Sequence, residues 1–172
     1  MDDPDPHDGA HGAGDWPQIL VLRDPREAWS RCSLRPLRGR DDIRFVTWTE
    51  RLELEAGPRV LLAPDAPPLS PADLGLGLFV IDCSWRRLPL IGRAVTDAPP
   101  RRSLPPLRTA YPRKSRTFPD PDAGLATVEA LFAAGVLLGR RDPSLLEGYH
   151  FAERFLALNP ELSEAGGGGD RR

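Results

Sequence analysis

The sequence predicts an α/β domain with a mainly parallel sheet, and two observations lead to that class. Short apolar, strand-like segments alternate along the chain with segments that carry helical signals. Residues 78–82 (LFVID) form a continuous apolar run, which is typical of a parallel strand covered on both faces. The 172 residues suit a single domain, and a content of 40% hydrophobic and 28% charged residues argues against wholesale disorder.

Four strands are predicted in order. Residues 19–22 are a short apolar run before an Asp-Pro pair, and residues 43–48 (IRFVTW) are rich in β-branched and aromatic side chains. Residues 59–62 (RVLL) give the third strand, and residues 78–82 give the fourth. A short extended piece is expected around Leu104, inside a proline-rich segment.

Helices are predicted between and after these strands. Residues 70–73 (SPAD) combine an N-cap Ser, a Pro at the first helical position and an acid at the third, so a short helical turn begins there. Ser84 can cap a helix that runs to Ile91. A longer helix is expected over 127–139, and a second over 143–158 that stops before Asn-Pro.

The two ends of the chain have the composition of tails. Residues 1–15 carry five Asp and no basic residue, and residues 163–172 read SEAGGGGDRR. We expect both to be disordered, which leaves residues 16–162 as the single folded domain. The N-terminus lacks the basic and apolar regions of a signal peptide, and the longest apolar stretch is too short to span a bilayer. A cytoplasmic protein that binds no membrane is therefore expected.

Cysteine and histidine contents speak against a metal site. The two cysteines, Cys32 and Cys83, lack metal-ligand spacing and are too few for a disulfide scaffold. They are expected to be reduced thiols. The chain has three histidines, two of which lie in the N-terminal tail, so no metal is expected.

Charge is concentrated in one segment. Residues 84–116 contain eight Arg and one Lys against a single acid, whereas residues 1–15 and 117–172 each carry a net negative charge. Such a segment indicates an anionic partner, of which nucleic acid is the commonest. A solvated surface in an arginine-rich chain is the alternative. The candidate phosphate contacts are Arg86, Arg87, Arg101, Arg102, Arg113, Lys114 and Arg116.

One short motif stands where α/β sheets bind their ligands. The fourth strand ends in Asp82-Cys83-Ser84-Trp85, at the carboxyl end of a predicted parallel strand. Asp82 offers a carboxylate there, and Trp85 offers a large flat apolar surface. The alternative is structural, with Asp82 or Ser84 capping the next helix and Trp85 packed in the core.

This motif also carries a family resemblance. Residues 80–85 (VIDCSW) resemble the VVDCSW signature of the small-subunit rRNA aminocarboxypropyltransferases, and further segments follow that family's motifs in order over residues 19–160. These segments are 31–37 (RCSLRPL), 62–64 with 69–73 (LAP, LSPAD), 104–112 (LPPLRTAYP), 125–131 (LATVEAL) and 149–159 (YHFAERFLALN).

The resemblance implies a SPOUT-like fold with a C-terminal trefoil knot. It implies that S-adenosylmethionine donates its 3-amino-3-carboxypropyl group to the imide nitrogen of a uridine or pseudouridine, with methylthioadenosine as by-product. By position in the family's motifs, Leu62, Pro64, Trp85, Leu104 and Leu125 would line the adenine and methylthio pocket. Main-chain groups at Ile81 and Leu104 would hold the ribose and the amino acid end, and Ser33 would bond the carboxylate.

Within that reaction Asp82 has more than one role open to it. It could favour the sulfonium electrostatically, or it could take the proton of the imide nitrogen as a general base. A stable carboxylate beside a cation would stabilise bound substrate as well as transition state, which favours a base or positioning role.

The sequence also departs from the family's pattern. Residues 111–116 (YPRKSR) replace N-P-V-N-Y-G, an extra stretch follows over 117–124, and Leu34 replaces a glycine. The expected partner is rRNA or a pre-ribosomal particle, bound by a monomer. Two alternatives stay open: a tRNA uridine aminocarboxypropyltransferase of the DTW-like group, and a non-catalytic RNA-binding module of ribosome assembly.

Overall fold

A computed structural model describes residues 18–112 and 124–164 of the chain. Its centre is a five-stranded sheet in the order β2-β1-β4-β3-β5, in which all pairings are parallel. The predicted α/β class is thus confirmed. The strands are β1 (Ile19–Arg23), β2 (Ile43–Thr47), β3 (Arg59–Leu62), β4 (Gly77–Asp82) and β5 (Arg101–Arg102).

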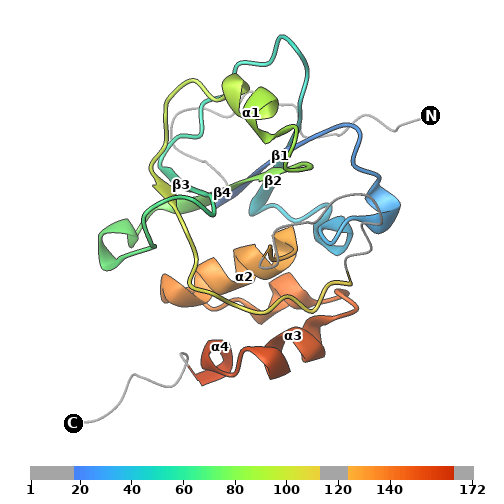
Figure 1. Cartoon of the computed structure of the whole chain (residues 1–172), viewed down its shortest axis with the longest axis vertical. Helices are drawn as coiled ribbons and strands as arrows, with labels where there is room; N and C mark the ends of the chain where they lie inside the picture. The colour runs from blue at the N-terminus through green and yellow to red at the C-terminus, as the bar shows by residue number, and fades with distance from the viewer. Residues whose placement is uncertain (1–17, 113–123, 165–172) are drawn as a thin grey trace.

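Helices cover both faces of the sheet. Figure 1 shows α1 on one side and α2, α3 and α4 on the other, with α2 between the sheet and α3. The α-helices are α1 (Leu88–Ile91), α2 (Thr127–Leu137), α3 (Ala152–Leu158) and α4 (Glu161–Glu164). The 3-10 turns are η1 (Trp29–Arg31), η2 (Arg35–Leu37), η3 (Pro71–Asp73), η4 (Gly92–Ala94) and η5 (Pro143–Leu146). Among the described helices, none is long and apolar enough to cross a membrane.

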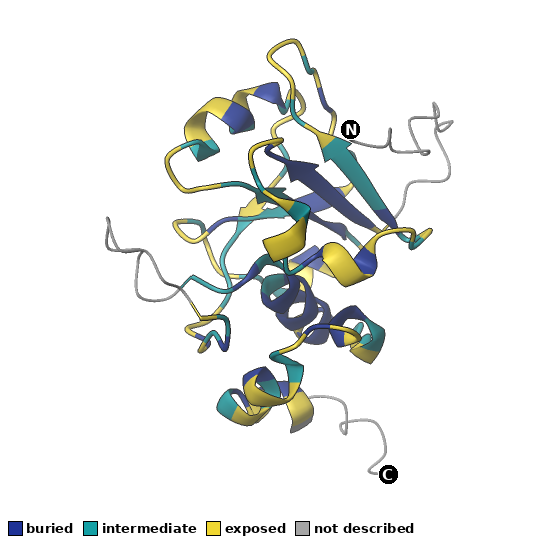
Figure 2. Ribbon diagram, turned by 90° about the vertical axis from the view of Figure 1, so that its right-hand side faces the viewer, coloured by how far each residue is buried: buried dark blue, intermediate teal, exposed yellow. Residues whose placement is uncertain are grey.

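The sheet separates two hydrophobic cores. In β1, Ile19 and Val21 pack in the core on the α2 side, while Leu20 and Leu22 pack in the core on the α1 side. The same alternation holds in β4, which lies between β1 and β3. This explains why these strands are apolar without interruption, since each face of a central parallel strand is covered. Figure 2 shows the central strands and α2 as buried.

The turn at Ser70 forms as predicted. Its hydroxyl accepts a hydrogen bond from the Ala72 amide, and the carboxylate of Asp73 accepts one from the Ser70 amide. The predicted start of the next helix at Ser84 is wrong, because α1 begins at Leu88. The extended piece expected around Leu104 lies slightly earlier in the chain, as β5 and a bridge at Ser103.

The predicted single helix over 143–158 is wrong. It is two elements, η5 and α3, which are separated by a turn at Gly148. Gly148 has a φ of +73°, a conformation that does not continue a right-handed helix. In addition, α4 occupies the first two residues of the predicted C-terminal tail. The predicted N-terminal tail and the rest of the C-terminal tail lie outside the described residues.

The parallel topology sets where a site can form. Because all five strands point the same way, their carboxyl ends share one edge of the sheet, which we call the carboxyl edge. Ligands of open α/β sheets bind outside this edge. Asp82 is the last residue of β4 and pairs in register with Arg23, the last residue of β1.

Candidate functional site

Asp82 joins three parts of the chain at the carboxyl edge. Its Oδ1 accepts a hydrogen bond from Thr127 Oγ1 at 2.8 Å, at the first residue of α2. Its Oδ2 accepts one from Arg23 Nε at 3.1 Å and lies 3.6 Å from Cys32 Sγ. The Asp82 side chain is 14% exposed and that of Arg23 is 5% exposed. The carboxylate therefore lies at the surface end of a buried ion pair.

The guanidinium of Arg23 is itself held by the segment that follows β1. It lies over the Trp29 ring, 3.6 Å from the ring centroid, and Nη2 donates to the Glu27 carbonyl oxygen at 3.0 Å. Arg23 ends a strand that the sequence predicts to end one residue earlier, so sequence reasoning did not identify it. An arginine that directly follows a buried strand and precedes Asp-Pro was the available signal.

A second buried ion pair lies beside the first. Asp24 is fully buried and its carboxylate pairs with Arg87, whose guanidinium also lies over the Trp48 ring. The Asp24 amide donates to the Asp82 carbonyl oxygen at 3.0 Å, which extends the pairing of β1 with β4 by one residue. Arg87 was a candidate phosphate contact, but its guanidinium binds within the fold.

These carboxylates perturb the acids and thiols around them. Burial raises the pKa of Glu27, and the charges of Asp82 and Asp24 raise it further. Burial, followed by the charge of Asp82, raises the pKa of the Cys32 thiol to about 11. Burial and the charge of Asp24 raise the pKa of Cys83 to about 12. Both thiols are free and are neutral near pH 7, so neither is an activated nucleophile.

Ser33 meets the same helix end as Asp82. Its hydroxyl accepts a hydrogen bond from the Val128 amide at 3.3 Å, one residue after Thr127. A helix N-terminus presents amide hydrogens and a partial positive charge, which favour an anionic group. Asp82 and Ser33, which are 49 positions apart in the sequence, are thus brought together by the first turn of α2.

The other predicted cofactor contacts differ in burial and in the core that they border. Leu62, Leu104 and Leu125 pack at the border of the core on the α2 side. The Ile81 side chain packs in the core on the α1 side, which leaves its main chain as the group that a ligand at this edge would meet. Trp85 is 39% exposed and follows β4 directly. Pro64 is exposed in the turn after β3.

The six candidate phosphate contacts other than Arg87 divide into three groups. Arg86 and Arg101 are exposed. Arg102 donates from Nε to both carboxylate oxygens of the buried Asp73, at 3.0 and 2.9 Å, and so braces η3. Arg113, Lys114 and Arg116 lie outside the described residues.

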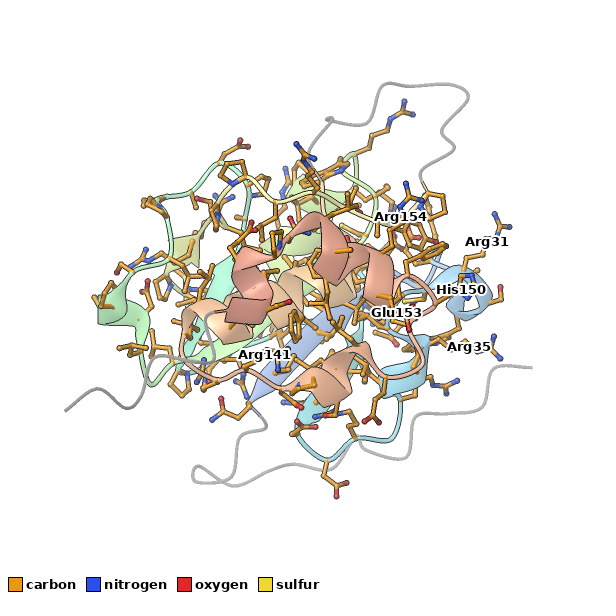
Figure 3. All side chains as sticks on the ribbon, turned by 90° about the horizontal axis from the view of Figure 1, so that it is seen from below. Arg31, Arg35, Arg141, His150, Glu153 and Arg154 are labelled. Carbon is orange, nitrogen blue, oxygen red and sulfur yellow. The ribbon has the colours of Figure 1, made fainter. Side chains whose placement is uncertain are left out.

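Sequence reasoning missed a second group of basic residues. Arg31 and Arg35 flank Ser33 and are exposed. Figure 3 shows them on the same side of the molecule as His150 and Arg154. They lie outside the basic segment 84–116, in a part of the sequence where acids and bases are nearly balanced.

Ring contacts connect this region to α3. The Tyr111 hydroxyl donates to the Arg31 carbonyl oxygen at 2.9 Å, and its ring packs edge-on against Phe151. Phe151 in turn contacts His150, with 4.9 Å between ring centroids. Tyr111 therefore packs within the fold, between Arg31 and Phe151.

A buried carboxylate that the sequence analysis overlooked fixes the loop beside the site. Glu129 is fully buried on α2 and accepts hydrogen bonds from Thr109 Oγ1 at 2.7 Å and from the Ala110 amide at 2.9 Å. It also accepts from the Ala126 amide and from the Tyr149 hydroxyl. Its position in the first turn of the predicted helix was the available signal. Among the described residues, no group of three His, Cys, Asp or Glu is placed to hold a metal ion.

Comparisons with known proteins agree with this architecture. A family model described as "Ribosome biogenesis protein, C-terminal" matches residues 60–165. The SAM-dependent rRNA:acp-transferase Tsr3 from Vulcanisaeta distributa is a similar solved structure, with 25% sequence identity and a TM-score of 0.62. The similarity covers 86% of this chain and 82% of that one. A search of curated proteins finds no match.

Proposed function

The chain belongs to the family of ribosome biogenesis proteins that this C-terminal domain defines, and we propose that it is an S-adenosylmethionine-dependent aminocarboxypropyltransferase acting on rRNA. One observation carries the proposal. Asp82 and Ser33 meet the first turn of α2 at the carboxyl edge, in a chain that is similar to an rRNA:acp-transferase over most of its length. The accepting atom would be the imide nitrogen of a uridine or pseudouridine.

In this proposal the carboxylate of S-adenosylmethionine binds to Ser33 and the first turn of α2. Hydroxyl donors and the positive end of the helix suit that group. The partly buried side chains of Leu62, Leu104 and Leu125, together with Trp85 and Pro64, provide apolar surface for the adenine and methylthio groups. Backbone groups of Ile81 and Leu104 hold the ribose and the amino acid end.

This orientation determines which carbon of the sulfonium reacts. Apolar walls around the methyl group leave the aminocarboxypropyl arm facing the RNA, so proximity selects that arm. The nitrogen forms a bond to the arm's terminal carbon while the carbon–sulfur bond breaks. Methylthioadenosine is then the leaving group, and the imide proton is lost.

RNA is the partner that the exposed arginines favour. Arg31 and Arg35 flank Ser33, and Arg86 follows Asp82 closely in the chain, so positive charge borders the proposed site. Arg113, Lys114 and Arg116 stay candidate phosphate contacts on the basis of the sequence alone. The knotted SPOUT-like path, the monomeric state and the cytoplasmic location remain expectations from the sequence and its family resemblance.

Isotope labelling tests the reaction. The protein is incubated with RNA isolated from cells that lack it. S-adenosylmethionine labelled at the carboxyl carbon should then leave its label on the RNA, whereas methyl-labelled S-adenosylmethionine should leave none. Methylthioadenosine should accumulate in equal amount. Formation of S-adenosylhomocysteine would instead show a methyltransferase, and the absence of any transfer would leave the chain as an RNA-binding assembly protein.

A further inference from the structure

The carboxylate of Asp82 has a protein donor on each oxygen. Thr127 donates to Oδ1 at 2.8 Å, and Arg23 donates to Oδ2 at 3.1 Å. The Cys32 thiol lies near the same Oδ2 atom, at 3.6 Å. Donors of the fold thus engage both oxygens and hold the carboxylate in one orientation, with one oxygen toward α2 and the other toward β1.

Arg23 cannot easily leave this arrangement. Its side chain is 5% exposed, its guanidinium lies against the Trp29 ring, and Nη2 is bound to the Glu27 carbonyl oxygen. A swing away from Asp82 would break these contacts and would leave a buried charge without its partner, which costs much more than the pair itself contributes.

The pair also determines where the first turn of α2 lies. Through Thr127 it connects the ends of β1 and β4 to the helix whose Val128 amide binds Ser33. Cys32, the neighbour of Ser33, contacts Asp82 directly. One ion pair thus holds the Ser33 hydroxyl and the amides of this helix end at a fixed position relative to β1 and β4.

We propose that Arg23 is a positioning residue of the transferase site, which holds Asp82 against Thr127 and thereby fixes the groups that bind S-adenosylmethionine. Asp82 then positions the site and does not accept the imide proton. The nitrogen attacks the terminal carbon of the arm, the electrons of the carbon–sulfur bond pass to sulfur, and the proton passes to solvent water. This inference rests on the proposed function, within which it assigns a role to Asp82.

A double-mutant cycle distinguishes a positioning pair from a general base. The variants are Arg23→Gln, Asp82→Asn and the combination of both, and the readouts are kcat and KM for S-adenosylmethionine with carboxyl-labelled substrate. Arg23→Gln takes the ion-pair partner from the partly buried Asp82, and Asp82→Asn takes it from the buried Arg23, so KM should rise about 10-fold or more in each. The double variant pairs two neutral amides and should return kcat and KM to within about 3-fold of wild type.

Each other outcome has a defined meaning. If Asp82 is the base, the double variant should keep the full loss of kcat shown by Asp82→Asn, on the order of 10²-fold or more, and this result would overturn the inference alone. If the wild type transfers no label, the proposed function fails, and the inference fails with it. Recovery in the double variant is decisive even if a single variant folds poorly.

Arg38→Gln is the matched control. Arg38 also places its guanidinium over the Trp29 ring, 4.7 Å from the centroid, but it is exposed and is not a hydrogen-bond partner of Asp82 in the described structure. Its loss should leave kcat and KM unchanged. A loss equal to that of Arg23→Gln would show that stacking on Trp29, and not the ion pair, supports the site, and would overturn the inference.

Discussion

Single residues at the carboxyl edge act through partners that are distant in sequence. Asp82 is bound by Arg23 and Thr127, and Asp24 is bound by Arg87. Charges buried in this way are stable only while they remain paired. Trp85 is different, because it is large, apolar and substantially exposed. This exposure is expected of a ring that becomes buried when a ligand binds.

We therefore expect Trp85→Ala to weaken binding of S-adenosylmethionine by about 2–3 kcal/mol, through the loss of aromatic burial against the ligand. Calorimetric titration of both proteins measures this change. Leu90→Ala is the control, since Leu90 is similarly exposed, on α1, at 41%. Unchanged affinity in Trp85→Ala would show that the ring does not line the binding site.

The raised pKa of Cys32 gives a prediction for its rate of alkylation and for the pH dependence of that rate. Because the pKa of Cys32 is raised to about 11, its thiolate fraction at pH 8 is low in the folded protein. Iodoacetamide should react with it on the order of 100-fold more slowly than in the urea-unfolded chain. The native rate should rise about tenfold per pH unit from 8 to 10. Mass spectrometry of the peptide measures both rates, and equal rates in native and unfolded protein would contradict the raised pKa.

At the level of elements, the first turn of α2 connects three other segments of the domain. Thr127 binds Asp82, the Val128 amide binds Ser33, and Glu129 binds the backbone and hydroxyl of the segment around Thr109. Three consecutive residues therefore hold three separate segments. The helix is nearly apolar all round because the sheet lies on one side and α3 on the other.

The turn between η5 and α3 gives a stability prediction. An alanine at Gly148 would adopt a positive φ and would place its Cβ 2.9 Å from Pro36 Cβ, whereas a Cβ at Gly139, which also has a positive φ, meets no atom within 4 Å. We expect Gly139→Ala to cost about 1 kcal/mol and Gly148→Ala about 2–3 kcal/mol. Urea unfolding of both variants checks this order, and equal losses would contradict the contact with η2.

At the scale of the whole molecule, positive charge gathers from separate segments. Arg31 and Arg35 come from η1 and η2, while Arg154 comes from α3, and Figure 3 shows the three arginines on one side together with His150 and Glu153. Tyr111 and Phe151 connect the two regions by direct contacts. Although the chain has a net charge of −2, three exposed arginines therefore lie on this side against one acid, Glu153, and arginines suit phosphates.

RNA affinity should fall steeply with salt, because arginines release counterions when they bind phosphates. Replacing Arg31 and Arg35 with Gln should flatten the slope of log K against log salt by about 1.5. Replacing Arg113, Lys114 and Arg116 together should also flatten it. Arg51 and Arg93, which are exposed, are the control pair, with Arg93 on the α1 side of the sheet. Filter binding at several salt concentrations measures the slopes, and equal slopes for wild type and the Arg31/Arg35 variant would place RNA elsewhere.

Local patterns in the sequence are sufficient to predict four strands, the capped turn at Ser70 and the helix at Thr127. They also place Asp82 and Trp85 at the end of a buried strand. Each of these features depends on residues that are close in the sequence, such as an apolar run or a cap. The family resemblance added Ser33 and the apolar residues proposed to bind S-adenosylmethionine, whose roles the described structure leaves as predictions.

The tertiary structure alone decides which groups face one another. The pairs Arg23–Asp82 and Arg102–Asp73 span 59 and 29 positions, and Glu129 binds donors up to 20 positions away. Periodicity assigns a residue to a face of its own element, but it does not say which element packs against that face. The interruption between η5 and α3 at Gly148 also depends on a distant segment, because Gly148 adopts a positive φ where Pro36 of η2 lies against it. For this reason, the sequence identifies Asp82 as a candidate, whereas only the fold reveals that an arginine already holds it.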